Sequence, residues 1–209
     1  AKRLMPHYQS LTVSQVAVLD LPVDGLHLIT GPPGSGKSVM AVYRTESLAN
    51  MGQPVILLQP GGAVDWDPRQ WGVDQTIVSI WHSWFPRWFR GAYGEDPPRV
   101  SEWGFDWDAC SRIAGHNPAP EELIPHLIVD EGQDLPRGFY TFFLFVGGSM
   151  TVFCDDNQPP APPPEGEPAE TGPKSPTAPD SSGTNAENMV TLGIKSHLRL
   201  ERTFQLRAD

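Results

Sequence analysis

Residues 29–38 read ITGPPGSGKS, and this stretch decides the fold that we expect for the chain. Its core, residues 31–38, fills the pattern GxxxxGK[ST] completely. An apolar strand at 26–29 precedes the loop, and residues 39–43 continue it as a helix. The glycines let backbone N–H groups converge on phosphate oxygens, and the positive end of the helix dipole adds to the site. A Gly-rich turn ahead of an ordinary helix is the alternative, and the flanking strand and helix favour a phosphate-binding loop.

The loop residues have separate expected roles. Lys37 should reach the β- and γ-phosphates of a nucleoside triphosphate, and the Ser38 hydroxyl should ligate Mg²⁺. We expect the nucleotide to contact the whole loop, which comprises Gly31, Pro32, Pro33, Gly34, Ser35, Gly36, Lys37 and Ser38.

A second motif supplies carboxylates for the metal and for water. The apolar run that starts at His126 ends in Asp130 and Glu131. Asp130 is placed to bind Mg²⁺, mostly through water, and Glu131 is placed to polarise the attacking water. Alone, such a run could be any strand that enters a loop. Together with a complete phosphate loop, it predicts a nucleoside triphosphatase.

Composition divides the 209 residues into a folded part and an insertion. Residues 159–179 hold nine of the 23 prolines and no aromatic or β-branched aliphatic residue. Such a stretch cannot bury enough apolar surface to order itself, so we read 159–184 as a disordered or polyproline-like insertion. The predicted core is 1–158, and 185–209 completes the same domain.

Charge and cysteine content exclude several classes of protein. The net charge of −10 argues against a general nucleic-acid coat protein, although a local basic groove remains compatible with it. Cys110 and Cys154 are far apart and suggest reduced thiols without metal-ligand spacing. No apolar run approaches the ~20 residues that span a membrane. We therefore expect a soluble cytoplasmic protein with no membrane partner.

Two further stretches carry a family resemblance. LIVDEGQDLP (127–136) and MTVFCDDNQ (150–158) resemble the second and third motifs of superfamily 1 helicases of the UvrD/Rep type. The resemblance implies a RecA-like α/β fold with a mostly parallel sheet, helices on both faces and ATP as the nucleotide. It also implies that Gln158 senses the γ-phosphate and that Gln133 relays nucleotide state toward the nucleic acid. Strands are expected at 26–30, 55–59, 76–80, 127–130, 150–154 and 197–200.

The resemblance continues toward both ends of the sequence. LTVSQ (11–15) resembles the Q motif of this family, in which the Gln15 amide would read adenine. A surface glutamine in the first turn of a helix is the alternative. LRLERTFQ (198–205) resembles the opening of the fourth motif, but Gln205 stands where the family has a phosphate-contacting arginine.

The resemblance covers nearly all of the predicted folded part, but only the first of the two RecA-like halves of such helicases. We therefore expect slow hydrolysis by this chain alone. A second RecA-like domain, a partner protein or a second copy would supply an arginine finger.

The decapeptide WHSWFPRWFR (81–90) has two interpretations. Its aromatic residues recur at the spacing of a buried helical stripe, which favours a core role for most of them. It also follows a strand and resembles the family's TFHS element, beside the path of single-stranded nucleic acid. His82 or Trp84 would then contact DNA or RNA. After the strand at 55–59, the backbone of Gly61 could contact phosphate.

The leading hypothesis is a helicase-type ATPase that couples ATP turnover to single-stranded DNA or RNA. A Zot-like phage assembly or secretion ATPase is one alternative, because LITGPPGSGKSVMAV resembles the opening of those proteins. The other is a non-catalytic protein-interaction module gated by nucleotide.

Overall fold

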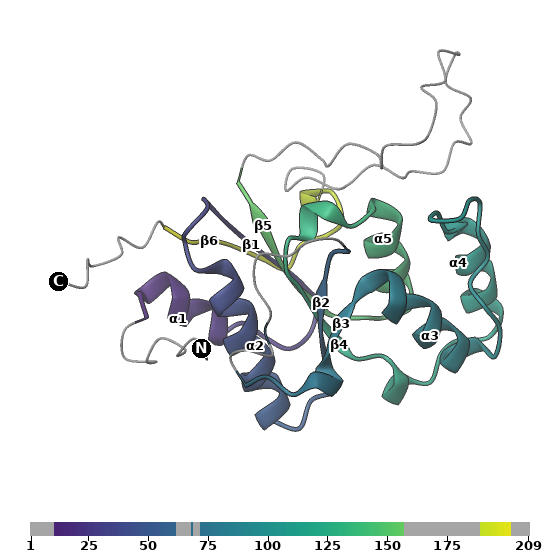
Figure 1. The fold of residues 1–209 in the computed structure, drawn as a ribbon, viewed down its shortest axis with the longest axis horizontal. Coiled ribbons are helices and arrows are strands. Elements are labelled where there is room, and N and C mark those ends of the chain that lie inside the picture. Colours follow the sequence, from purple (N-terminus) through teal and green to yellow (C-terminus); the bar gives the residue numbers. More distant parts are fainter. Residues whose placement is uncertain (1–10, 62–67, 69–71, 157–188, 202–209) are drawn as a thin grey trace, which may run out of the picture.

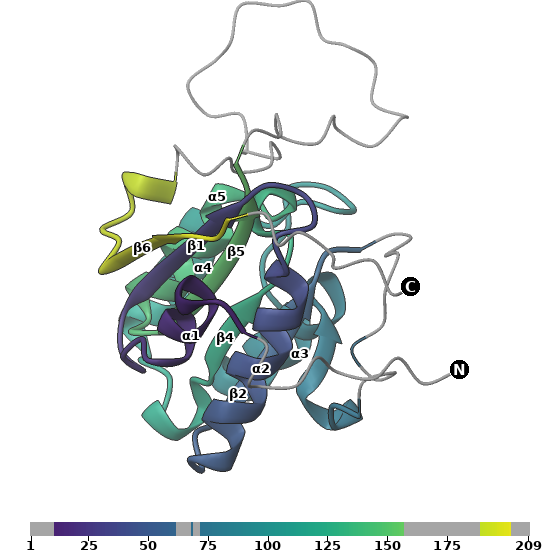
Figure 2. The ribbon, with the colours of Figure 1, turned by 90° about the vertical axis from the view of Figure 1, so that its left-hand side faces the viewer.

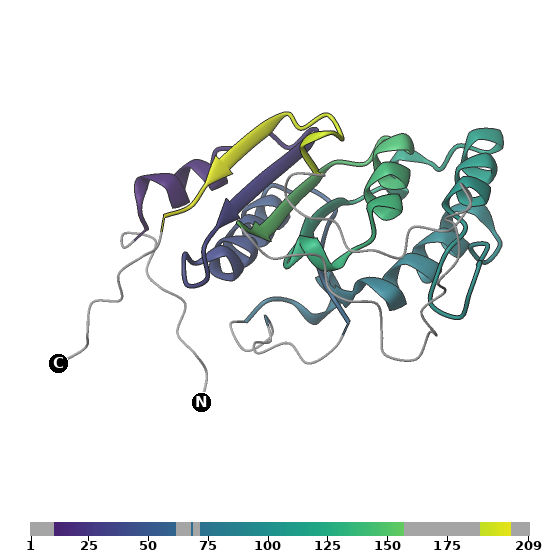
Figure 3. The same ribbon diagram turned by 90° about the horizontal axis from the view of Figure 1, so that it is seen from above.

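The structure is a computed structural model that describes residues 11–61, 68, 72–156 and 189–201. Its centre is a six-stranded sheet with the order β3-β2-β4-β5-β1-β6, in which every pairing is parallel. Figure 3 shows β6, β1 and β5 side by side with their arrowheads at the same edge. The strands are β1 (Leu26–Gly31), β2 (Val55–Gln59), β3 (Val78–Ile80), β4 (His126–Val129), β5 (Met150–Asp155) and β6 (Ser196–Arg199).

The expected strands are confirmed, each to within two residues. The largest difference is at β3, where residues 75–77 form a 3-10 turn instead of the start of the strand. Asp74 explains this start because its carboxylate accepts hydrogen bonds from the backbone N–H and the hydroxyl of Thr76. Such a local side-chain bond competes with strand pairing.

Helices cover both faces of the sheet, as predicted (Figure 1). One face carries α1 (Val13–Leu19) and α2 (Lys37–Asn50). The other carries α3 (Trp81–Tyr93), α4 (Trp107–His116) and α5 (Arg137–Phe145).

The strands alternate between two hydrophobic cores. In β5, Val152 and Cys154 pack toward α3–α5, whereas Phe153 packs toward α1 and α2. Successive side chains of a strand point to opposite faces, so a strand that is apolar throughout must be covered on both sides. All six residues of β1 and of β5 are buried, including the polar His27 and Thr151.

The aromatic decapeptide forms α3, and its main role is in the core. Trp81, Trp84, Phe85 and Phe89 are buried, which confirms the helical stripe predicted from their spacing. Pro86 lies inside this helix and removes one backbone hydrogen-bond donor there. The aromatic packing against α5 therefore compensates for the backbone hydrogen bond that α3 lacks at Pro86.

The strand β6 forms one edge of the sheet. Figure 2 shows β6 beside β1, although most of the sequence separates the two strands. Among the described residues, no helix is both long enough and apolar enough to cross a membrane. Gln158, the Pro-rich segment 159–184 and Gln205 lie outside the described residues.

Candidate nucleotide site

The predicted phosphate loop and carboxylates meet at one edge of the sheet. Gly31 ends β1, Asp155 ends the neighbouring strand β5, and Asp130 directly follows β4. Gly31 and Asp155 are register partners. Parallel strands present their carboxyl ends at the same edge, where open α/β sheets bind ligands.

The loop has the backbone that its glycines permit. Gly34 and Gly36 have φ angles of +79° and +86°, in the left-handed region that favours glycine. Gly36 is the N-cap of α2, and no side chain caps this helix end. The first N–H groups of a helix lack partners within the helix and carry its partial positive charge. This end of α2 therefore suits an anion.

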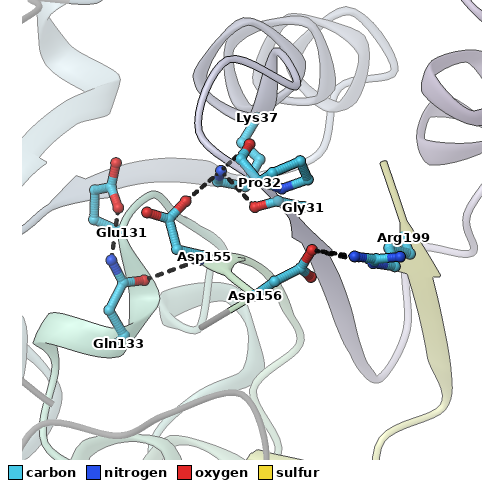
Figure 4. A network of polar contacts seen from close by, with 8 residues as sticks. All are labelled: Gly31, Pro32, Lys37, Glu131, Gln133, Asp155, Asp156 and Arg199. Atoms are coloured by element: carbon cyan, nitrogen blue, oxygen red, sulfur yellow. Dashed lines mark hydrogen bonds and ion pairs between the residues drawn. The ribbon is translucent and has the colours of Figure 1, made fainter. Parts of the chain in front are cut away.

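Lys37 is folded back onto the loop (Figure 4). Its Nζ donates to the carbonyl of Gly31 at 2.9 Å and to that of Pro32 at 3.2 Å, and it forms an ion pair with the Asp155 carboxylate. Lys37 is 6% exposed and Asp155 is 9% exposed. An ammonium group has three N–H donors, so these three acceptors can occupy all of them.

Asp130 is the most deeply buried acid of the site, with 1% of its surface exposed. Burial, helped by the neighbouring charge of Glu131, raises its pKa to about 7. The nearby Ser38 hydroxyl acts in the opposite direction on this pKa. Neither carboxylate oxygen has a hydrogen-bond partner of good geometry. Burying such a group without a partner is unfavourable.

These residues fit a magnesium ion. A buried carboxylate without a hydrogen-bond partner of good geometry and a nearby hydroxyl are oxygen donors of the kind that Mg²⁺ prefers. No cluster of three or more His, Cys, Asp or Glu side chains that could hold a metal occurs in the described part of the chain. Mg²⁺ is usually held by one or two carboxylates that act together with substrate phosphates.

Glu131 has an unusual backbone conformation. With φ +52° and ψ +49°, it is the one non-glycine residue with a positive φ among those described. Such a conformation costs about 1–3 kcal/mol and often marks a functional site. Next to it, Gly132 leaves no room for a side chain, because a Cβ there would overlap Val152.

Gln133 joins Glu131 to the end of β5. Its Nε2 donates to Glu131 Oε2 at 2.7 Å, and its Oε1 accepts from the backbone N–H of Asp155 at 3.4 Å. One buried amide thus connects the expected general base with the residue that pairs with Lys37 (Figure 4). The family resemblance gave Gln133 a relay role, and the structure gives it these two partners.

Asp155 is a site residue that sequence reasoning missed. The family resemblance of residues 150–158 implies a role only for the last residue, Gln158. A signal was present, because Asp155 is the acid that directly ends a buried strand. Its neighbour Asp156 instead forms a salt bridge with Arg199 of β6, with Nη2 and Oδ2 2.8 Å apart.

Gln15 is buried and has two defined structural contacts. It completes a capping box with Thr12 at the start of α1, in which its Oε1 accepts from the Thr12 N–H at 3.0 Å. Its Nε2 donates to the Ser35 carbonyl of the phosphate loop at 3.2 Å. Gln15 therefore holds the loop against α1, and it lies at the loop as the Q-motif resemblance implied. Its contact with adenine stays a prediction.

The three candidate nucleic-acid residues have different surroundings. Gly61 and His82 lie together, because a Cβ added to Gly61 would be 3.4 Å from Nδ1 of His82. His82 is half-buried, and burial, together with the charge of Arg99, lowers its pKa. Trp84 is 7% exposed and stacks on Trp88 with ring centroids 5.6 Å apart, so it offers no free face to a base.

A phosphate loop after β1, acidic residues after β4 and β5, and a parallel sheet covered on both faces define a RecA-like P-loop domain. The fold resembles that of the Pif1 helicase from Candida albicans, a superfamily 1 protein, with a TM-score of 0.53 and 17% identity. That match covers 95% of this chain and 41% of the helicase, so this chain spans less than half of its length. The resemblance expected from the sequence is therefore confirmed for the fold of one RecA-like domain.

Two structures of Pif1 from Bacteroides match less closely. The protein bound to ssDNA has a TM-score of 0.40 and 18% identity, over 69% of this chain and 32% of that one. The complex with ADP-AlF3 and ssDNA has a TM-score of 0.35 and 15% identity, over the same shares of the two chains. No protein-family model and no curated protein matches the sequence.

Proposed function

We propose that this chain is the ATP-binding and ATP-hydrolysing domain of a helicase-type protein that acts on single-stranded nucleic acid. The observation that carries the proposal is the meeting of Lys37, Asp130 and Glu131 beside the phosphate loop at one edge of the sheet. The likeness of the fold to a helicase domain supports the same class.

The residues divide the proposed chemistry between them. The N-terminus of α2 and Lys37 bind the phosphates of ATP, and Glu131 accepts a proton from the attacking water. The oxygen of this water bonds to the γ-phosphorus, and the bond to the bridging oxygen of ADP breaks, so that ADP and phosphate leave. Ser38 and Asp130 would hold Mg²⁺, which neutralises charge on the phosphate oxygens when it is bound.

The strained backbone and the amide contact fix Glu131 for this role. A general base must lie within hydrogen-bond reach of the proton that it takes. The bond from Gln133 limits the rotation of the Glu131 side chain, while the backbone at Glu131 sets its direction. Gln158, at the γ-phosphate, stays a prediction from the family resemblance.

The proposed path of nucleic acid passes Gly61 and His82 at the carboxyl ends of β2 and β3. The half-buried imidazole can contact a base or a phosphate, and the backbone N–H of Gly61 can donate to a phosphate oxygen. Trp81 packs against the His82 ring, with ring centroids 3.8 Å apart, and the buried ring of Trp84 makes no contact with the strand in this proposal.

We further propose that the domain depends on an arginine finger from a second RecA-like domain, a partner protein or a second copy. Such a finger increases turnover by about 10³–10⁵. The likeness to less than half of a helicase supports this dependence. The proposed domain limits are 1–158 and 185–209, with 159–184 as an insertion, and the proposed location is the cytoplasm, where ATP is available.

ATP hydrolysis with and without single-stranded DNA or RNA tests the proposal. We expect slow turnover that nucleic acid stimulates and that Lys37→Ala abolishes. Unstimulated turnover would instead support an assembly or secretion ATPase of the Zot-like kind. Nucleotide binding without any turnover would support a nucleotide-gated interaction module. Absence of nucleotide binding would exclude all three.

A further inference from the structure

We infer that Asp155 is a positioning residue of the nucleotide site, a built-in counter-ion that holds Lys37 until a phosphate displaces it. The inference rests on the proposed function, because it concerns the lysine that would bind ATP. It assigns to Asp155 a role that neither the loop motif nor the carboxylates after β4 predict.

The bonding of Lys37 gives the first argument. The three acceptors around its ammonium group are the Gly31 carbonyl, the Pro32 carbonyl and the Asp155 carboxylate. With three donors occupied, Lys37 must exchange a partner before it can bind a phosphate oxygen. Asp155 is the one anion of the three, so it competes most directly with a phosphate for the positive charge.

The surroundings of the ion pair give the second argument. Both side chains are almost fully buried, so the pair is poorly screened by water. A phosphate at Lys37 would bring a second anion close to Asp155, and like charges repel strongly in a buried site. The Asp155 carboxylate therefore opposes phosphate binding in two ways, by occupying the lysine and by repulsion.

The position of Asp155 explains why it stays in place during the exchange. It is the last residue of β5 and pairs in register with Gly31, so the sheet fixes its backbone. Its N–H also donates to Gln133, whose amide contacts Glu131. Lys37, in contrast, has a long flexible side chain. The lysine is therefore the partner that moves when a phosphate arrives.

Asp155→Asn tests the inference in the full chain. The variant removes the charge but keeps the size of the side chain. We expect it to bind ATP and inorganic tripolyphosphate about tenfold more tightly than wild type, within the roughly 5- to 150-fold range of coupling between ligands. The same variant should unfold at a lower temperature without ligand, because Lys37 loses its buried partner. A purely structural role would weaken stability and binding together.

Asp156→Asn is the matched control. Asp156 is the next residue and also carries a charge, but it pairs with Arg199 instead of Lys37. We expect its affinity for both ligands to stay within about twofold of wild type. Asp155→Glu restores the charge and should return the affinity toward the wild-type value. Asp155→Ser replaces Asp155→Asn if the latter does not fold, as judged by circular dichroism.

The outcomes distinguish a failure of the inference about Asp155 from a failure of the proposed function. If wild type binds both ligands and a folded variant without the Asp155 charge binds them equally or more weakly, the inference is overturned and the proposed function stands. If wild type binds neither ATP nor tripolyphosphate, the proposed function fails, and the inference fails with it.

Discussion

At the scale of single residues, the nucleotide site keeps Lys37 and Asp130 away from water. The cation has a partner in Asp155, whereas burial raises the pKa of the Asp130 carboxyl to about 7. A buried acid favours its neutral form until a cation stabilises the ionised one. Mg²⁺ bound with the nucleotide would supply such a cation.

Glu131 gives the most direct residue-scale prediction. Glu131→Gln keeps the size of the side chain but removes the base, so hydrolysis should fall by about 10²–10⁴. Nucleotide affinity should change little, because the phosphates bind at α2 and Lys37. Phosphate release and equilibrium binding of ATP measure the two effects separately.

Glu122→Gln is the control for this change, since it alters an exposed glutamate ahead of β4. Its turnover should match that of wild type. A Glu131→Gln variant with normal turnover would show that another group accepts the proton.

His126 predicts a dependence of stability on pH. Its Nδ1 lies 2.9 Å from the Val23 carbonyl and its Nε2 lies 2.8 Å from the Thr151 hydroxyl, and burial lowers its pKa to about 3. The unfolded chain has an ordinary histidine pKa of about 6.5 and so binds an extra proton between pH 3 and 6.5. Neutral His126 makes its full contribution to the free energy of unfolding above pH 6.5. Below pH 6.5 this contribution decreases by roughly 1.4 kcal/mol per pH unit.

Urea unfolding of wild type and His126→Gln at pH 7.5 and pH 5 measures this effect. At pH 7.5 wild type should be the more stable, and at pH 5 the difference should shrink by roughly 2 kcal/mol. The pKa of Asp130 acts in the opposite direction over this range, but it is common to both proteins and cancels in the comparison. An equal difference at both pH values would contradict the prediction.

At the scale of elements, α3 combines a packing face with a proposed binding end. Phe85 is fully buried among Phe105, Phe139 and Phe142, whereas His82 in the first turn is only half-buried beside Gly61. A helix that follows a short strand can thus anchor itself in the core and still present its first turn at the edge of the sheet.

The two roles of α3 predict opposite phenotypes. Phe85→Ala should lower the free energy of unfolding by about 3–5 kcal/mol, because it leaves a cavity in the aromatic core. His82→Ala should change this free energy by less than about 1 kcal/mol. It should weaken binding of single-stranded nucleic acid by about tenfold, as expected for the loss of one contact.

Urea unfolding and fluorescence anisotropy with a labelled oligonucleotide measure these effects. Each variant serves as the control for the other. If His82→Ala binds the oligonucleotide as wild type does, the proposed path beside β3 is wrong.

At the scale of the whole molecule, local sequence patterns predicted the architecture well. The loop at 29–38 indicated a strand, a turn and a helix in order, and the apolar runs indicated the other strands. All three features appear, because a strand buried on both faces is mostly apolar and therefore reads as an apolar run in the sequence. The spacing of Trp84 and Phe85 similarly indicated a buried helical face.

Contacts between distant segments were not predictable in this way. The pair Lys37–Asp155 and the contact of Gln15 with Ser35 depend on strand order and loop path. No short pattern states that β5 lies next to β1. The backbone conformation of Glu131 could not be predicted either, since a positive φ is uncommon outside glycine and no sequence pattern indicates it here.

The whole domain is organised so that three neighbouring strands, β4, β5 and β1, end at the proposed nucleotide site. The sheet therefore sets the distances between the groups that act on the phosphates. Local changes at this edge should alter nucleotide binding without changing the fold, provided that the cores on both faces stay intact.

A crystal structure with Mg²⁺ and a nonhydrolysable ATP analogue is the most direct measurement of the central claim. We predict phosphate density over residues 31–38, with Lys37 turned from Asp155 to a phosphate oxygen and a metal ion near Ser38 and Asp130. An empty loop at saturating analogue, or an analogue bound elsewhere on the domain with Lys37 still paired to Asp155, would contradict the account.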